Sequence, residues 1–381
     1  ARQQAGRAGR GLESAAAGSR DRALAFVDGI ADSGGTNIRD ALVRALGMMR
    51  AGDRPNYVLF LTDGQPTVGL TEPAAILREV AGANGARARI FAFGVGHDVN
   101  TGLLDKLTLE NRGASVYVAP DENLELALSN FYDKISSPLL ADLKLEIKGI
   151  EVRDVYPRTL PDLFRGSQLI LVGKYRGGGP ASLLLTGKVG KESRRFILEG
   201  QKLANDPSNN FLPRIWATRR IGYLLEEIRL HGASPELVDE VKKLGLAFGI
   251  VTPYTSYLVT ERERMALPAA APEAQDALAK GAVTGKGAVT MATYSQAMKA
   301  EDRAARVESS LIRYREDKTF YLKDGFWVDS AFKEGSAVRE LKYDSDEYYK
   351  LAGERPGLAK YLSVAQKMIV CFEGVNYKIR D

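Results

Sequence analysis

The feature that most constrains the fold is an alternation of short apolar runs with helical segments over residues 22–137. Residues 57–62 (YVLFLT) are continuously apolar and stop at Asp63 and Gly64, as expected for a strand buried on both faces. Residues 38–49 carry apolar side chains at helical spacing. The other expected elements are strands at 89–93 and 115–118 and helices at about 71–85, 101–110 and 123–135. This order predicts a partial doubly wound α/β domain, a parallel sheet with helices on both faces.

The pattern changes after residue 137. Residues 142–148 alternate apolar and charged side chains, which is typical of a half-exposed strand in an antiparallel sheet. Glycine-rich turns separate the further candidate strands 152–156, 168–174, 181–186 and 195–198. Two helices are expected at about 212–230 and 235–248. We therefore predict a β-sandwich with a helical segment over residues 138–262.

The start of the chain and one internal stretch differ in composition. Residues 1–21 are rich in Arg, Ala and Gly without an apolar period, which predicts a disordered tail. Residues 263–310 are rich in Ala, Gly, Lys and Thr, which is typical of a flexible linker. A hairpin turn at Asp324 and Gly325 then opens the last stretch, 311–381, for which we expect a small α+β module.

Composition and charge exclude several classes of protein. The 53 Lys and Arg residues are interspersed with 48 Asp and Glu residues, so the pattern does not indicate a nucleic-acid partner. Cys371 is the only cysteine, which excludes an intrachain disulfide and a cysteine-based zinc site. It lies in the apolar run 368–372, where we expect a buried, inert thiol. No stretch has the apolar length of a membrane span. The chain begins at Ala1 without a methionine or a signal peptide, which suggests a processed or truncated product.

In a doubly wound sheet, ligands bind at the carboxyl ends of the strands. Three segments are expected there: residues 34–37, which open a helix, Asp63 after one strand, and residues 94–98 after the next. Thr36 and Asp63 therefore place a hydroxyl and a carboxylate on adjacent loops. These hard oxygen donors suit Mg²⁺, which takes few protein ligands and keeps several waters.

Plainer interpretations of the same residues stay open. Thr36 can be a residue at the N-terminus of a helix that accepts a backbone hydrogen bond, and Asp63 can belong to a common turn after a strand. His97 lies at the same sheet edge without a nucleophile in a recognisable elbow nearby, which favours a solvated loop histidine. Residues 281–286 lack the spacing and the preceding strand of a phosphate loop. A hydrolase is therefore a third-ranked hypothesis, although the fold class can carry one.

Three segments resemble a known family. "SGGTNIRDAL" (33–42) and "VLFLTDGQPTVG" (58–69) resemble the second and third metal-binding loops of von Willebrand factor A domains. "FAFGVGHDVNTGLLDKL" (91–107) resembles the strand, loop and helix that follow in that domain. The chain is similar in particular to bacterial relatives of the inter-alpha-trypsin inhibitor heavy chains. The runs that carry this closer similarity are 154–177, 211–259 and "KTFYLKDGFWVDS" (318–330).

The resemblance implies a metal-ion-dependent adhesion site. In such a site Ser, Thr and Asp side chains hold a divalent ion, Mg²⁺ or else Ca²⁺ or Mn²⁺, and an Asp or Glu of a protein partner completes its coordination. By this resemblance Thr36 and Asp63 are the metal ligands. The implied function is that of a protein-binding or adhesion scaffold, bacterial and exported, and not that of an enzyme.

The sequence departs from the family in one respect. The first metal-binding loop, an Asp-x-Ser-x-Ser after the first strand, occurs nowhere in the 381 residues, and the family's N-terminal module is not recognisable either. Thr36 and Asp63 alone supply too little charge to offset the dehydration of Mg²⁺. Either the chain is cut from a longer protein, or another polypeptide supplies the missing strand. The second hypothesis is therefore a structural subunit of a larger assembly with a vestigial site.

Overall fold

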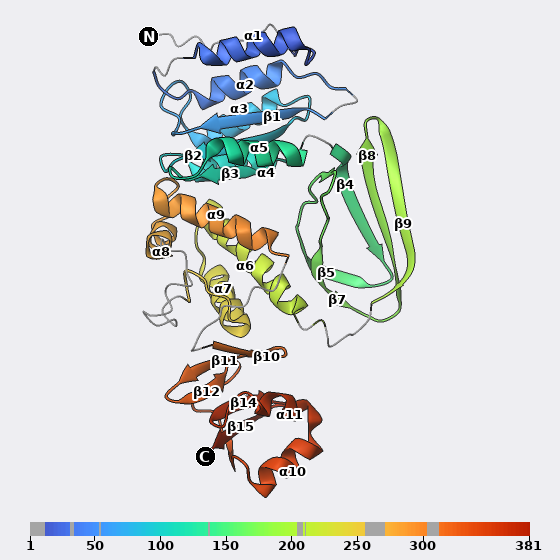
Figure 1. Ribbon diagram of the computed structural model, residues 1–381, viewed down its shortest axis with the longest axis vertical. Coiled ribbons are helices and arrows are strands. Elements are labelled where there is room, and N and C mark those ends of the chain that lie inside the picture. Colours follow the sequence, from blue (N-terminus) through green and yellow to red (C-terminus); the bar gives the residue numbers. More distant parts are fainter. Residues whose placement is uncertain are drawn as a thin grey trace.

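The computed structural model describes residues 12–30, 34–52, 55–135, 138–203, 209, 211–255, 271–302 and 312–381. Figure 1 shows three parts in chain order: an α/β part, a β-rich part with a layer of helices, and a C-terminal module. Separate clusters of buried apolar side chains form the cores of the α/β part, the helical layer and the C-terminal module.

A parallel sheet in the strand order β1-β2-β3 forms the centre of the α/β part. Its strands are β1 (Tyr57–Thr62), β2 (Arg89–Val95) and β3 (Ser115–Val118). Its helices are α1 (Ala17–Asp28), α2 (Ile38–Gly47), α3 (Pro73–Ala83), α4 (Thr101–Glu110) and α5 (Leu124–Ile135). Both strand pairings are parallel, so the predicted α/β fold with a parallel sheet is confirmed.

Strand β1 is buried on one face only. Val58 packs in the core that α2 and α3 form with the sheet, whereas Leu59 is 40% exposed and Leu61 45% exposed. The prediction of a strand buried on both faces is therefore wrong for β1. Helix α5 covers β2 through Phe131, whose ring packs edge-on against Phe93. Among the described residues, β1 pairs with β2 and with no other strand, so its outer edge forms no strand ladder.

The predicted disordered tail, 1–21, is wrong for residues 17–21. These residues form the first part of α1, in which no residue is buried. The side chain of Ser19 accepts a hydrogen bond from the N–H of Ala16 (3.1 Å) at the start of this helix. Helix α1 therefore depends on local stabilisation, to which its alanines contribute because Ala has the highest helix propensity. Residues 1–11 lie outside the described residues.

The antiparallel sheets predicted after residue 137 are present as two small sheets. One has the strand order β6-β4-β8-β9, and the other pairs β5 with β7. Their strands are β4 (Pro138–Lys148), β5 (Glu151–Tyr156), β6 (Leu163–Phe164), β7 (Val172–Arg176), β8 (Pro180–Val189) and β9 (Glu192–Lys202). Strand β9 is exposed along its whole length. Tyr156 is fully buried, because it belongs to the core of the helical layer.

The flexible linker predicted over 263–310 is wrong for residues 271–302. They contain α8 (Ala271–Ala279) and α9 (Lys286–Ala300), which pack against α6 (Leu212–His231) and α7 (Pro235–Phe248). Met291 and Met298 of α9 are buried in this core. Residues 256–270 and 303–311 lie outside the described residues. In the described part of the chain, no helix has the length and apolar character needed to cross a membrane.

Small residues allow the close contact between α6 and α9. A Cβ atom on Gly222 of α6 would lie 2.8 Å from the backbone nitrogen of Lys299 and 2.9 Å from the carbonyl oxygen of Ser295. The composition of 271–302, rich in Ala and Gly, is typical of flexible segments. In this structure the stretch forms two helices, and its small side chains allow helix backbones to pack closely.

The C-terminal module is a mixed sheet with two helices, as expected for an α+β module. The strand order is β10-β11-β12-β14-β15-β13. Its elements are β10 (Ile312–Arg315), β11 (Lys318–Lys323), β12 (Phe326–Asp329), β13 (Arg339–Lys342), α10 (Asp346–Glu354), α11 (Pro356–Leu362), β14 (Met368–Phe372) and β15 (Val375–Arg380). The hydroxyl of Tyr321 donates to the carbonyl oxygen of Leu246 (2.8 Å), which connects the module to α7.

Candidate functional site

The carboxyl ends of β1 and β2 and the loop before α2 form one edge of the parallel sheet. We call this edge the rim, made of residues 34–37, 63–68 and 96–99. The side-chain oxygen Oγ1 of Thr36 lies 3.5 Å from the position that a Cβ atom would take on Gly64, the residue after Asp63. The structure therefore places the two loops that carry Thr36 and Asp63, the residues that the sequence analysis selected as metal ligands, next to each other.

Hydrogen bonds hold the loop of Thr36 against the loop that follows β1. The carbonyl oxygen of Thr36 accepts from the N–H groups of Thr67 (2.9 Å) and Val68 (3.2 Å). The N–H of Thr36 donates to Oγ1 of Thr67 (2.8 Å). A Cβ atom on Gly35 would lie 2.4 Å from the side chain of Val68, so this approach requires glycine. The position of Thr36 is thus fixed by its backbone.

The side chain of Thr36 does not cap helix α2. Asn37 is the N-cap residue, and its side chain accepts a hydrogen bond from the N–H of Asp40 (3.2 Å). The interpretation of Thr36 as the helix-capping residue is therefore wrong. Among the described residues, the Oγ1 atom of Thr36 has no hydrogen-bond partner, which leaves this oxygen accessible for a ligand.

Asp63 follows β1 in a turn, as the plainer interpretation predicted, but its carboxylate is not part of the turn. Oγ1 of Thr62 donates to the carbonyl oxygen of Gly64 (3.0 Å) and accepts from its N–H (3.3 Å). Asp63 is exposed. Its carboxylate forms neither a hydrogen bond nor an ion pair with another residue in the described part of the chain. The fold thus leaves this carboxylate exposed to solvent, on the loop that lies against the loop of Thr36.

The rim supplies part of a divalent-ion site. Groups of three or more His, Cys, Asp or Glu residues that could hold a metal ion are absent from the residues that the structure describes. Thr36 and Asp63 have the oxygen chemistry that Mg²⁺ prefers, but an octahedral ion needs further ligands. The described residues therefore fit two positions around such an ion and do not form a complete cage.

The loop between α8 and α9 closes one side of the rim. The N–H of Gly285 donates to the carbonyl oxygen of His97 (2.8 Å). The carbonyl oxygen of Val283 accepts from the N–H (2.8 Å) and the hydroxyl (3.0 Å) of Thr101 at the start of α4. Residues 281–286 follow helix α8 and not a strand, which differs from the strand–loop–helix order of a phosphate loop.

A buried polar network lies at α4, next to the rim. Asp105 of α4 and Arg229 of α6 form an ion pair in which both side chains are only 3% exposed. Asp105 also accepts hydrogen bonds from the hydroxyl of Tyr117 (2.8 Å) and the amide of Gln296 (3.2 Å). Burial, with the nearby charge of Asp105, raises the pKa of Tyr117 well above its usual value, so its hydroxyl stays a donor.

The sequence analysis missed this network. Asp105 lies between Leu104 and Leu107 on the buried, largely apolar face of α4, and a carboxylate at such a position is the signal that could have revealed the network. Two of its partners, Arg229 and Gln296, lie on helices far along the chain, so no spacing rule connects them to Asp105.

Comparison with protein families identifies one domain in the chain. The model of the von Willebrand factor type A domain matches residues 11–134. This range contains the whole parallel sheet, Thr36 and Asp63. The predicted resemblance to this domain is confirmed.

Curated proteins similar to this chain include two human heavy chains. Inter-alpha-trypsin inhibitor heavy chain H4 of Homo sapiens is 32% identical over 270 residues, which cover 66% of this chain and 29% of that protein. Heavy chain H6 of Homo sapiens is 31% identical over 257 residues, which cover 60% of this chain and 19% of that protein. The chain thus spans less than a third of the length of these relatives. The narrower similarity to bacterial relatives stays a prediction.

Solved structures also include similar chains. The von Willebrand factor type A from Catenulispora acidiphila is 16% identical, with a TM-score of 0.43, and the match covers 76% of this chain and 75% of that chain. The ArnB paralog VWA2 from Sulfolobus acidocaldarius is 17% identical, with a TM-score of 0.37, and the match covers 71% of this chain and 70% of that chain.

Proposed function

We propose that the chain is a protein-binding scaffold whose partner binds at the rim. The premise is that the chain contains a von Willebrand factor type A domain and is related to the inter-alpha-trypsin inhibitor heavy chains. The observation that carries this proposal is the placement of Thr36 and Asp63 on neighbouring loops. Their side-chain oxygens are not used by hydrogen bonds within the described part of the chain. Domains of this type typically mediate protein binding.

In the proposed binding mode, the rim and the partner share one divalent ion, Mg²⁺ or else Ca²⁺ or Mn²⁺. Thr36 and Asp63 would hold the ion, and an Asp or Glu of the partner would complete its coordination. An acidic partner group is favoured because the single carboxylate of Asp63 offsets only part of the ion's charge. The proposed role is adhesion by an exported protein, with no chemical step and no nucleic-acid partner.

A metal titration tests the two assigned ligands. We expect Mn²⁺, followed by electron paramagnetic resonance, to bind the full chain together with an acidic peptide. Affinity should fall at least about tenfold in Asp63→Ala and Thr36→Val, because each change removes a ligand oxygen. Thr36→Ser should restore binding, since it keeps the hydroxyl.

Asp98→Ala is the matched control for this experiment. Asp98 is an exposed carboxylate on the rim that is not assigned as a ligand, so its removal changes the local charge equally. If the affinity for Mn²⁺ is the same in wild type and Asp63→Ala, the metal-dependent mode is wrong. If Asp98→Ala and Asp63→Ala weaken Mn²⁺ equally, the ion is attracted by general charge only.

The second candidate function is that of a structural subunit, and the outer edge of β1 favours it. Strands of parallel sheets are normally buried on both faces, whereas β1 exposes Leu59 and Leu61. An open edge of this kind can accept a strand from another polypeptide. Light scattering under native conditions distinguishes the candidates: a subunit should self-associate or capture a partner strand, and a monomer at all concentrations contradicts this role.

A further inference from the structure

A large cleft lies at the end of the parallel sheet opposite the rim. It has a volume of about 1450 Å³, and its lining comes from the α/β part, the antiparallel sheets, α6 and α9. Phe91, Phe131 and Leu143 contribute an apolar surface. Arg112 and Gly113, just before β3, place the cleft at the amino ends of the strands. It is therefore separate from the rim, which lies at the carboxyl ends.

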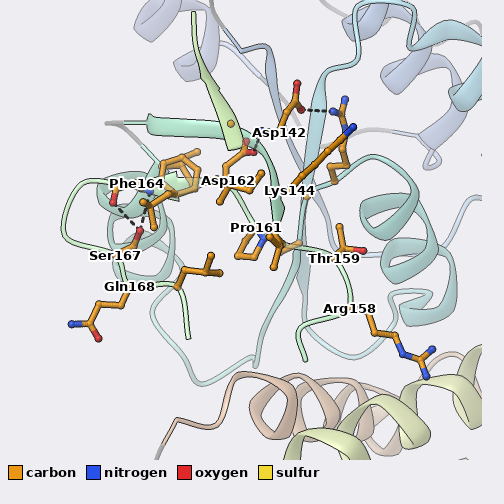
Figure 2. Close-up of a pocket in the computed structure, with 18 of the residues that line it drawn as sticks. Asp142, Lys144, Arg158, Thr159, Pro161, Asp162, Phe164, Ser167 and Gln168 are labelled. Atoms are coloured by element: carbon orange, nitrogen blue, oxygen red, sulfur yellow. Dashed lines mark hydrogen bonds and ion pairs between the residues drawn. The ribbon is translucent and has the colours of Figure 1, made fainter. Parts of the chain in front are cut away.

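One wall of the cleft is the segment 158–169, all of which lines it. Figure 2 shows Arg158, Thr159, Pro161 and Asp162 of this segment around the pocket, together with Lys144 of β4. The segment belongs to the run 154–177 that contributes to the family resemblance, but it is not part of the rim. We therefore assign it the role of forming the wall of the cleft.

Ion pairs fix the walls of the cleft in place. Arg89 at the start of β2 donates to Asp162 (2.5 Å) and to Asp142 (3.0 Å). The side chains of Arg89 and Asp162 are 7% and 11% exposed. Arg112 also donates to Asp142 (2.7 Å). Because these contacts connect the α/β part directly to the antiparallel sheets, the cleft exists before a ligand binds, which lowers the entropic cost of binding.

The charges that line the cleft are unbalanced. Every acidic side chain of the lining is already engaged. Asp142 and Asp162 bind Arg89, Glu226 pairs with Lys299, Glu227 pairs with His231, and Asp133 also has an interaction partner. By contrast, several cationic side chains of the lining form no ion pair among the described residues: Lys144, Arg158, Arg165 and Arg195. The free charge in the cleft is therefore positive.

We propose that this cleft binds an extended acidic peptide segment of a partner protein. The carboxylates of the peptide would pair with the free cations, and its apolar side chains would contact Phe91, Phe131 and Leu143. The apolar surface favours a peptide over a nucleic acid or a sulfated polysaccharide, because those polyanions need a continuous basic track. In this cleft the cationic side chains do not form such a track, because apolar side chains such as Leu160 and Leu163 lie between them in the lining.

Strand β9 provides a matched pair of variants for the test. Arg195 lines the cleft, whereas its neighbour Arg194 does not and pairs with Glu192 (2.5 Å). Successive residues of a strand point to opposite faces of the sheet. Arg195→Ser and Arg194→Ser therefore remove the same charge at nearly the same place, and only the first changes the cleft. Both side chains are exposed, so both variants should fold like the wild type.

Fluorescence anisotropy of the full chain with labelled peptides tests the proposal. The probes are a peptide of alternating Glu and Leu, a peptide of alternating Glu and Ser, and a heparin oligosaccharide. We expect the Glu–Leu peptide to bind more tightly than the other two probes. Arg165→Ser and Arg195→Ser should each weaken it about threefold to fivefold, as expected for a partly exposed ion pair. Arg194→Ser should leave its affinity unchanged.

The rim variant Asp63→Ala should also bind the Glu–Leu peptide as tightly as wild type in the absence of divalent ions, because the cleft does not depend on the rim. A negative result of the Mn²⁺ experiment would therefore not contradict the cleft proposal. A negative result of the peptide experiment would likewise not contradict the proposed metal site at the rim. No binding of the Glu–Leu peptide, or equal effects of Arg194→Ser and Arg195→Ser, would overturn the proposal. Tighter binding of the Glu–Ser peptide or of heparin would overturn it in favour of a general polyanion site.

Discussion

Arg229 of α6 and Asp105 of α4 form a buried ion pair, although 124 positions separate them in the chain. Both charges are removed from water, so each depends on the other for compensation. The pair connects the helical layer to the α/β part next to the rim. This ion pair therefore helps to fix the position of α4, which begins at Thr101 next to the rim.

Removal of one partner of this pair should destabilise the fold. Asp105→Leu or Arg229→Met alone should lower the free energy of unfolding by about 3–5 kcal/mol, because an uncompensated buried charge remains. The double variant Asp105→Leu with Arg229→Met should lose clearly less than the sum, since both charges disappear together. Urea denaturation followed by circular dichroism measures these values. Additive losses in the double variant would contradict the coupling.

The contact between α6 and α9 should not tolerate a larger residue at position 222. Gly222→Ala places a methyl group within 2.8 Å of the backbone of Lys299, so we expect a loss of about 1–3 kcal/mol in the free energy of unfolding. Gly82→Ala in α3 is the matched control, because nothing lies within 4 Å of its added methyl group. It should be neutral or stabilise by up to about 1 kcal/mol. Thermal unfolding measures both, and equal stability of the two variants would exclude the tight contact.

Asp142 should make the stability depend on pH in the acid range. Burial alone would raise its pKa, but Arg89, Arg112, Arg87 and Lys188 together hold the pKa below the ordinary 3.8. A lowered pKa in the folded state stabilises the fold above the ordinary value, and this contribution is lost as the pH falls through the folded pKa. Asp142→Asn should therefore be less stable than wild type at neutral pH.

The difference between wild type and Asp142→Asn should shrink as the pH falls below 3.8, where the wild-type carboxyl group becomes protonated. Urea unfolding of both proteins at neutral and acid pH measures this change. Asn also tolerates the positive φ of 52° at this position, so the substitution adds little backbone strain. A difference that stays constant with pH would contradict the role of the carboxylate charge.

Cys371 should react slowly with alkylating reagents. Burial, with the nearby charge of Asp329, raises the pKa of its thiol to about 11, and only the thiolate is a nucleophile. At neutral pH, modification by iodoacetamide should be much slower in the folded protein than in denaturant. Mass spectrometry gives a direct measurement, because the chain has a single cysteine. Equal rates in the folded and denatured protein would contradict this prediction.

The sequence predicts the elements of the parallel sheet well because the signals for them are local. The apolar run 57–62 and the helical spacing of 38–49 are visible without knowledge of the fold. The prediction of a flexible linker is wrong for residues 271–302 for the opposite reason. The small residues of this stretch are typical of flexible chain and of closely packed helices alike, and only the contact with Gly222 distinguishes the two.

The candidate ligands Thr36 and Asp63 could be selected from the sequence because the carboxyl ends of neighbouring parallel strands converge. The network around Asp105 could not, because Arg229 and Gln296 reach it from helices that are distant in the chain. The cleft could not be predicted from the sequence for the same reason. Its cations are scattered along the sequence, and only the tertiary contacts, among them the pairing of Arg89 with Asp162, bring them around one space.

Strand β2 begins beside the cleft and ends at the rim. Its 7 residues, at about 3.3 Å each, separate the two places by roughly 20 Å. Ligands bound at the two proposed sites would therefore not compete for space, and a single molecule would hold two partners in a ternary complex. In that arrangement the sheet acts as a rigid spacer between them, and its length sets how far apart they are held.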